Sequence, residues 1–320
     1  MSDNTVMTVL GPVSPGALGV VDAHSHLYIA SVAGGAADAP VLTDEAGIGR
    51  ELAAFRAAGG GAIVDCQPGG CGRDGRVLQR LSKQSGVHVV ASTGFHRRRY
   101  YPPDAPLFAL SAEAAADVFR DEIGNGLVET RASGQDDGTP AAAVFPGLIK
   151  IAAEASLPAS PIALFEAAAA VARETGYAVE MHTERGAAVM EFLAFFVARG
   201  LSPRRLVFCH VDKRPDFGLH RELALAGVML EYDTFFRPKY EPERHVWPLI
   251  RQMAGAGLAD HVALATDMAD PGYWAELGGA PGLPGFFTII KEGLTRMSLP
   301  PAVIDGLLGG NIAGRLAVGE

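Results

Sequence analysis

The sequence predicts an α/β protein, a (β/α)8 TIM barrel that forms one domain over residues 1–320. Short apolar runs typical of buried parallel strands alternate with helical patterns along the chain, and there are eight such runs. No glycine-rich nucleotide-binding motif follows an early strand, which argues against an open, doubly wound sheet. Barrels of this class commonly reach 320 residues as one domain.

The eight apolar runs are the expected strands. They cover 20–26, 62–66, 87–93, 147–151, 177–182, 205–210, 227–233 and 261–267. Between them, apolar residues recur every three to four positions, as they do in amphipathic helices. The expected helices cover 43–58, 74–85, 111–129, 162–175, 187–199 and 219–226. Ser160-Pro161 is expected to cap the fourth helix, and the polar tract from Thr130 to Pro140 to form an exposed insertion.

Composition and charge exclude several classes of function. A net charge of −9 argues against a nucleic-acid partner, because phosphate binding requires clustered Lys and Arg. Three cysteines cannot form a closed disulfide framework and suggest a reducing compartment. No secretory leader and no bilayer-spanning apolar segment is apparent. We therefore expect a cytoplasmic protein that binds a small molecule and has no membrane partner.

His24 and His26 end the first expected strand. Side chains alternate along a strand, so both imidazoles face one side and Ser25 faces the other. Two adjacent imidazoles are half of a metal site. Because His-x-His pairs also arise by chance, the other strand ends must decide their role.

Four further strands end in residues that can bind a metal. They are Lys150, His182, His210 and Asp267, on the fourth, fifth, sixth and eighth strands. Taken singly, each has a structural explanation, such as a hydrogen bond to a loop or an ion pair. In a barrel, however, all of these ends meet at the mouth where active sites lie. We expect His24, His26 and Asp267 around one ion, and His182 and His210 around another.

Lys150 is expected to bridge the two ions. Burial in an apolar strand should lower its pKa, and a neutral amine can react with carbon dioxide to form a carbamate. The two carbamate oxygens can each contact one ion. The expected cofactors are therefore two divalent metal ions, with N6-carboxylated Lys150 and a hydroxide between them.

Several segments resemble the phosphotriesterase-like branch of the amidohydrolase superfamily. Besides the ligand set, they are 62–66, 72–74, 87–95, 147–152, 181–183 and 310–316. The resemblance covers most of the chain. It implies an eight-stranded barrel, a binuclear zinc centre and hydrolysis of esters, lactones or phosphotriesters. Barrels of this branch are commonly dimers, so it also implies a homodimer.

Three positions depart from the family pattern. Ser25 replaces a common glutamate, but this position faces away from the ligands. Phe95-His96 follows the third strand where organophosphate-degrading relatives have tryptophan, which argues against efficient turnover of aryl phosphotriesters. Asp270 follows the eighth strand where the sugar-lactone branch has a basic residue. An acidic residue there would repel phosphate, so the substrate is expected to be a carboxylate, a neutral lactone or a related compound.

Substrate selection is expected to lie in the loops. The candidate anion anchors are Arg97, Arg237 and Lys239, and the candidate walls are Tyr232, Tyr273 and Trp274. Exposed arginines are usually only solvated, and aromatic loop residues usually pack against neighbours, so these assignments have structural alternatives. Asp267 is expected to accept a proton from the hydroxide and pass it to the leaving group.

The cysteines and three other histidines have structural interpretations. Cys66 and Cys71 lack the second pair that a thiolate metal site needs. Cys209 precedes His210 and is expected to face away from the mouth. His88, His220 and His261 lie away from the strand ends, and we interpret them as structural.

The expected function is hydrolysis of a small lactone or carboxylic ester. Sugar-derived and anionic lactones are among the expected substrates. A phosphotriesterase or an amide hydrolase with the same centre is the alternative, because the metal chemistry is shared and specificity lies in loops. A third hypothesis is a non-catalytic binding protein that keeps metal for stability. A structural site needs no open position, so the complete ligand set favours an enzyme.

Overall fold

A ring of parallel strands forms the centre of the computed structural model, which describes residues 4–131 and 142–319. Three strands pair in chain order, and so do six further strands. The first group is β3 (Val20–Ser25), β4 (Gly60–Asp65) and β5 (His88–Val90); the second is β6 (Ser92–Gly94), β7 (Leu148–Ala152), β8 (Val179–His182), β9 (Leu206–Cys209), β10 (Met229–Tyr232) and β11 (Val262–Leu264). Only Ala91 separates β5 from β6, so these two segments are the expected third strand.

The ring closes between its first and last strands. The backbone N–H of Asp267 donates to the carbonyl of His24 over 2.8 Å, and that of Thr266 donates to Asp22 Oδ1 over 3.0 Å. The expected (β/α)8 barrel is therefore confirmed, with all eight strands at the expected places.

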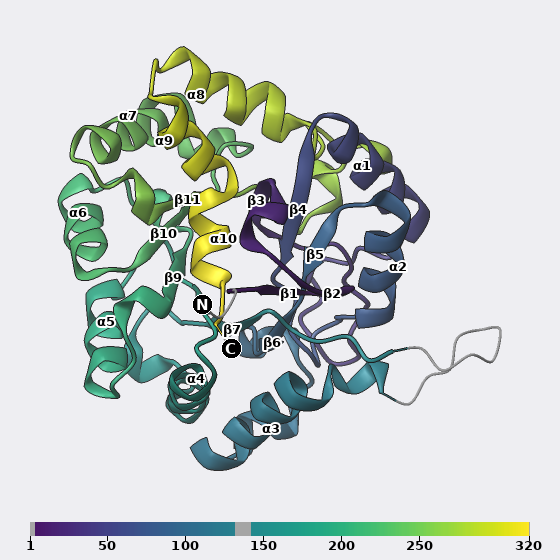
Figure 1. Cartoon of the computed structure of the whole chain (residues 1–320). Coiled ribbons are helices and arrows are strands. Elements are labelled where there is room, and N and C mark those ends of the chain that lie inside the picture. The colour runs from purple at the N-terminus through teal and green to yellow at the C-terminus, as the bar shows by residue number, and fades with distance from the viewer. Residues whose placement is uncertain (1–3, 132–141, 320) are drawn as a thin grey trace.

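Helices surround the strands, as Figure 1 shows. They are α1 (Glu45–Ala57), α2 (Gly75–Ser85), α3 (Ala112–Asn125), α4 (Ile162–Thr175), α5 (Val189–Ala198), α6 (Phe217–Ala226), α7 (Pro242–Gly255), α8 (Glu292–Arg296), α9 (Pro301–Asp305) and α10 (Asn311–Leu316). The outward strand residues, among them Ile149, Phe208 and Leu230, pack with helix residues in one large core. No helix in the described part of the chain is long and apolar enough to cross a bilayer.

An apolar floor closes one end of the barrel. A hairpin of β1 (Val6–Thr8) and β2 (Gly11–Val13) lies there with α10, and both chain ends lie beside α10 in Figure 1. Val6 and Leu316 pack with the interior residues Leu148 and Val207 in a second, fully buried cluster. The amino-terminal hairpin and α10 therefore seal the end opposite the mouth.

The helix expectations were met unevenly. Asp74 caps α2 by accepting hydrogen bonds from two backbone N–H groups of its first turn. Ser160 does not cap α4, because its hydroxyl bonds to the backbone of Glu154 and Ser156 instead. The expected helix 111–129 ends at Asn125, followed by a short 3-10 turn. The hairpin and α7 were not expected, and most of the expected insertion, 132–140, lies outside the described residues.

Candidate metal centre

The interior of the barrel is stacked in layers because side chains alternate along each strand. Apolar residues form the lowest layer, and every second residue above them is polar on several strands. This middle layer contains Cys66, Lys150, Glu180, Cys209 and Glu231, all fully buried. The strand ends above it form the mouth.

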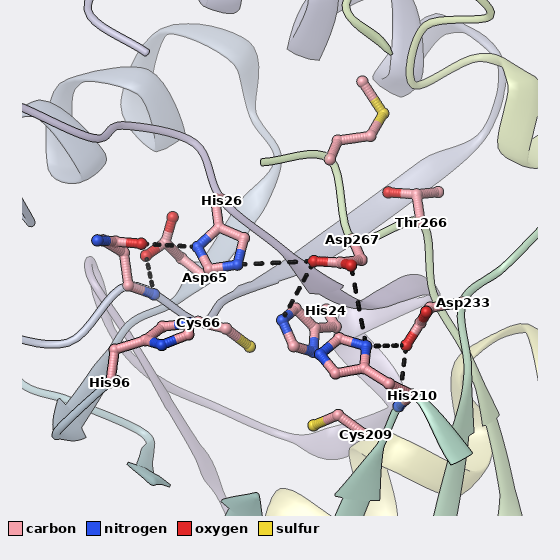
Figure 2. A network of polar contacts seen from close by, with 12 residues as sticks. His24, His26, Asp65, Cys66, His96, Cys209, His210, Asp233, Thr266 and Asp267 are labelled. Carbon is pink, nitrogen blue, oxygen red and sulfur yellow. Dashed lines mark hydrogen bonds and ion pairs between the residues drawn. The ribbon is translucent and has the colours of Figure 1, made fainter. Parts of the chain in front are cut away.

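The mouth brings together five of the six predicted ligands, and Figure 2 shows four of them, His24, His26, His210 and Asp267. Asp267 Oδ1 lies 3.7 Å from His24 Nε2 and 3.8 Å from His26 Nε2, and Asp267 Oδ2 lies 3.8 Å from His210 Nδ1. The rings of His182 and His210 are 4.7 Å apart. Nitrogen and oxygen donors from four strands thus surround one small volume.

Hydrogen bonds orient the histidines. Nδ1 of each of three rings bonds to an oxygen: His24 to Glu231 at 2.8 Å, His26 to Gln67 at 2.8 Å and His210 to Asp233 at 2.5 Å. His182 instead uses Nε2, 3.1 Å from Glu184 Oε1. With one nitrogen held in this way, the other nitrogen of each ring is available as a ligand, which is how proteins usually orient metal-binding histidines.

Burial keeps these imidazoles neutral. It lowers the pKa of His26 to about 4, and lowers the pKa of His24, His182 and His210 below its usual value as well. Neutral imidazole is the form that binds a metal. The charge state of the four rings therefore fits a ligand role.

Asp267 is held in place and ionised. Its backbone is in the left-handed region (φ 49°), and the Arg237 guanidinium donates to its Oδ2 over 2.8 Å. Burial would raise the pKa of Asp267, but Arg237, His210 and Lys213 outweigh burial and lower it. Arg237 also donates to the carbonyls of Asp233 and Thr266, so it joins the segments that follow β10 and β11.

Lys150 lies in the middle layer, beneath the mouth. Its Nζ is 3.0 Å from Glu180 Oε1 and 3.4 Å from Cys209 Sγ. Burial would lower its pKa, but the two interior cysteines, Glu180 and Glu231 outweigh burial and raise the pKa well above its usual value. The prediction that the pKa of Lys150 is lowered is therefore wrong. The Lys150 side chain lies among acidic groups, which stabilise its ammonium form.

Cys209 also differs from the expectation. Cys209 faces the interior beside Lys150, and His210 reaches the mouth only because its backbone leaves the strand in a left-handed conformation (φ 63°). Strand alternation therefore does not apply between these two neighbours. Cys66 Sγ contacts Glu180 Oε1 at 2.7 Å, in the same layer.

A cavity of about 320 Å³ opens over the mouth. His24, His26, His182, His210 and Asp267 lie in its wall, and the opposite wall is the loop between β3 and α1. The other lining residues are Ile29, Ala30, Ser31, Val32, Gly35, Ala36, Ala37, Ala39, Pro40, Val41, Gln67, Cys71, His96, Tyr100, Lys213 and Ala269. The cavity therefore has a polar side, formed by the predicted ligands, and a mainly apolar side.

The structure does not bring the predicted aromatic walls to this cavity. Tyr232 is fully buried on the outer face of β10, and its hydroxyl bonds to His220 Nδ1 over 2.8 Å. Trp274 is fully buried too, and its indole N–H donates to the carbonyl of Met268. Tyr273 lies outside the lining, with its ring 5.0 Å from the Arg237 guanidinium.

The predicted anion anchors are engaged elsewhere. Arg97 pairs with Glu154 at 3.0 Å and with Glu184 at 2.6 Å on the rim. Arg237 holds Asp267, and Lys239 is exposed beside Tyr240. None of the three lines the cavity in the part of the chain described.

Sequence reasoning missed the residues that support the ligands. Glu180 and Glu231 were visible as single acids inside otherwise apolar strands, a pattern that indicates an interior polar contact. Gln67, His96 and Lys213 lie in connections, where the sequence carries no periodic signal.

The donors present fit a divalent cation. Ligand atoms of His24, His26 and Asp267 all lie within 4.8 Å of one another. Glu180 Oε2, Glu231 Oε2 and Asp233 Oδ1 are buried without a hydrogen-bond partner in the described structure. A buried carboxylate oxygen without a hydrogen bond is unfavourable, and a nearby cation would stabilise it.

Comparison with known proteins places the chain among hydrolases. The model of the phosphotriesterase family matches residues 4–280. A phospho-furanose lactonase of Mycoplasmopsis synoviae is 28% identical over 280 residues, covering 83% of this chain and 77% of the relative. An N-acetyltaurine hydrolase of Tetraodon nigroviridis is 30% identical over 263 residues, 72% of this chain and 71% of the relative. The crystal structure of an amidohydrolase from Mycoplasma synoviae superposes with a TM-score of 0.88 at 24% identity, covering 100% of this chain and 94% of that one.

Proposed function

Because the chain belongs to the phosphotriesterase family of hydrolases, we propose that it hydrolyses a small lactone or carboxylic ester at a binuclear metal centre. The convergence of three neutral histidines on the ionised Asp267, with His182 beside His210, carries this proposal. A relative named phospho-furanose lactonase supports the choice of lactones as the first substrates.

The proposed ligands divide into two groups. His24, His26 and Asp267 would hold one ion, and His182 and His210 the other. Lys150 would bridge the two as its carbamate. Carboxylation needs the neutral amine, whereas Glu180 and Glu231 favour the ammonium. Nearby cations favour the neutral amine, so we propose that carboxylation and metal loading depend on each other.

When bound, divalent ions such as Zn²⁺ would supply Lewis acidity and a nucleophilic hydroxide near neutral pH. The protein's part is to position the donors and to move a proton. Asp267 is ionised and lies against the nitrogens of three histidines, so its carboxylate can accept a proton in the attack step. The Arg237 guanidinium donates a hydrogen bond to Oδ2 of Asp267 and so orients the carboxylate for this proton transfer.

Amide hydrolysis is a second candidate. The relative that is 30% identical over 263 residues is named N-acetyltaurine hydrolase, and the proposed centre suits either acyl substrate. Phosphotriester hydrolysis is a weaker alternative, because Phe95-His96 follows the third strand where organophosphate-degrading relatives have tryptophan.

A panel of lactones, esters, matched amides and a phosphotriester tests the proposal on the zinc-loaded protein. Turnover should appear on the lactones or esters and fall at least about a hundredfold in Asp267→Asn, because loss of a positioned proton acceptor removes acid–base catalysis. Asp260→Asn, the same change at an exposed carboxylate, is the matched control and should leave turnover unchanged. No turnover by metal-loaded protein on any panel member would favour the binding-protein hypothesis.

A further inference from the structure

One of the four histidines at the mouth is held the opposite way round from the others. The other three rings use Nδ1 for their hydrogen bonds, whereas His182 uses Nε2, which lies 3.1 Å from Glu184 Oε1. An ionised carboxylate can only accept a hydrogen bond, so Nε2 of His182 carries the proton and Nδ1 carries the free lone pair. The nitrogen that His182 offers to a cation is therefore Nδ1.

The support of His182 also differs in its exposure. The partners of the other three rings are buried, and two of them, Glu231 and Asp233, are fully so. Glu184 lies on the rim of the mouth, in the connection from β8 to α5, and its side chain is 31% exposed. Of the four rings, that of His182 is thus the one whose support is open to solvent.

Arg97 holds Glu184 from a neighbouring loop. Its Nη1 lies 2.6 Å from Glu184 Oε1, the same oxygen that His182 contacts, and its Nη2 lies 3.0 Å from Glu154 Oε2. Arg97 belongs to the connection after β6, Glu154 to the connection after β7 and Glu184 to the connection after β8. The planar guanidinium therefore joins three consecutive connections and fixes one oxygen of Glu184 against His182.

We propose that Glu184 and Arg97 are positioning residues for the metal centre, and that they set the affinity of the ion held by His182 and His210. This inference rests on the proposed function, because it concerns the second ion of the same centre. A hydrogen bond to the far nitrogen fixes the direction of a ligating ring and raises its basicity. Glu184 supplies that bond, and Arg97 keeps the carboxylate from turning towards solvent. Because salt screens an exposed ion pair, this ion should be the one that salt and a chelator remove first.

Zinc titration in competition with a chelator measures the affinities of the two ions separately. In Glu184→Met the affinity of the weaker ion should fall about 10- to 100-fold, and that of the tighter ion should stay within about twofold. Glu184→Gln keeps an oxygen that accepts from His182 Nε2–H and should recover most of the lost affinity, because a charge at the exposed rim contributes little. In Arg97→Met the loss should be at most about fivefold for the same reason.

Glu154→Met is the matched control, because Glu154 pairs with the other arm of Arg97 but has no hydrogen bond or ion pair with His182. Its side chain is 28% exposed, close to the value for Glu184. Both zinc affinities should stay within about twofold of wild type. Unchanged affinities or equal losses of both ions in Glu184→Met, an equal loss in Glu184→Gln, or the same loss in Glu154→Met would overturn the positioning role.

The ring nitrogens of His182 can also be observed in metal-free protein. Near neutral pH, long-range nitrogen–proton NMR spectra of wild type should show His182 protonated at Nε2, with its signals identified by their absence in His182→Gln. A mixture with the Nδ1–H form should appear in Glu184→Met but not in Glu154→Met. The same ratio of the two forms in wild type and Glu184→Met would show that Glu184 does not hold the ring, and would overturn the inference.

The two measurements separate this inference from the proposed function. One ion or none in zinc-supplied wild type would remove the binuclear centre and with it the effect on the second ion, while the NMR spectra would still decide whether Glu184 orients His182. If two ions bind but no ester, lactone or amide is hydrolysed, the proposed function fails, and the zinc affinities still decide the roles of Glu184 and Arg97.

Discussion

The two ends of the barrel are built from the same eight strands but have opposite chemistry. At the floor, Leu148 and Val207 pack with Val6 and Leu316 in a dry apolar cluster. At the mouth, the same strands end in histidines and Asp267, held by buried acids. The difference indicates that the floor stabilises the fold, whereas the mouth gathers buried nitrogen and oxygen donors that fit a bound cation.

The largest expected effect on stability lies at the floor. Leu316→Ala should lower the free energy of unfolding by about 2–5 kcal/mol, because it leaves a cavity in a buried cluster. Catalytic turnover at a temperature where the variant is folded should be unchanged. Leu225→Ala, on the exposed face of α6, should change stability by less than about 0.5 kcal/mol. Chemical denaturation measures the free energy of unfolding of both variants. A large loss of activity in folded Leu316→Ala would contradict the separate roles of the floor and the mouth.

A smaller effect is expected just below the mouth. Glu231→Gln should weaken zinc binding about 10- to 100-fold, because Glu231 holds Nδ1 of His24. Competition with a chelator measures the affinity. Glu222→Gln, an exposed change on α6, should leave the affinity unaltered. Equal zinc affinities in wild type and Glu231→Gln would mean that metal binding at the mouth does not depend on the layer beneath it.

His220 provides a contrast with the histidines of the mouth, because both of its nitrogens are satisfied. Nδ1 accepts from Tyr232, and Nε2–H donates to the carbonyls of Val211 and Arg214. Burial lowers its pKa from 6.5 to about 4.

Between pH 6.5 and pH 4, His220 is therefore protonated in the unfolded chain but neutral in the folded protein. The stabilisation that neutral His220 provides is complete above pH 6.5 and is lost as the pH falls to 4. Between pH 7 and pH 5, wild type should lose roughly 2 kcal/mol more stability than His220→Gln. Urea unfolding at the two values measures this difference, and parallel losses would show that His220 titrates normally in the folded protein.

The sequence was sufficient for the strands and for the residues at their ends. A strand can be recognised in the sequence from the length and periodicity of its apolar run. A histidine or aspartate that ends such a run can be recognised in the same way. The floor hairpin was missed because β1 and β2 are three residues each, too short for a pattern. α7 was missed because Pro248 lies inside it, although Val246, Leu249, Ile250 and Met253 follow a helical period.

Side-chain direction was harder to predict than position. Cys209 faces the interior instead of away from it, and His210 still reaches the mouth because it adopts a left-handed conformation, which no local pattern announced. The Lys150 pKa moves opposite to the expectation because its neighbours come from other strands. The engagement of Arg237 with Asp267 likewise depends on loops that meet only in the folded chain.

Metal content measured on protein purified without chelator, in wild type and in Lys150→Ala, tests the central claim most directly. The account predicts close to two ions per wild-type chain, with a sharp fall in folded Lys150→Ala that added bicarbonate does not reverse. One ion or none in folded wild type supplied with zinc and bicarbonate, or an unchanged two ions in Lys150→Ala, would contradict a binuclear centre bridged by Lys150.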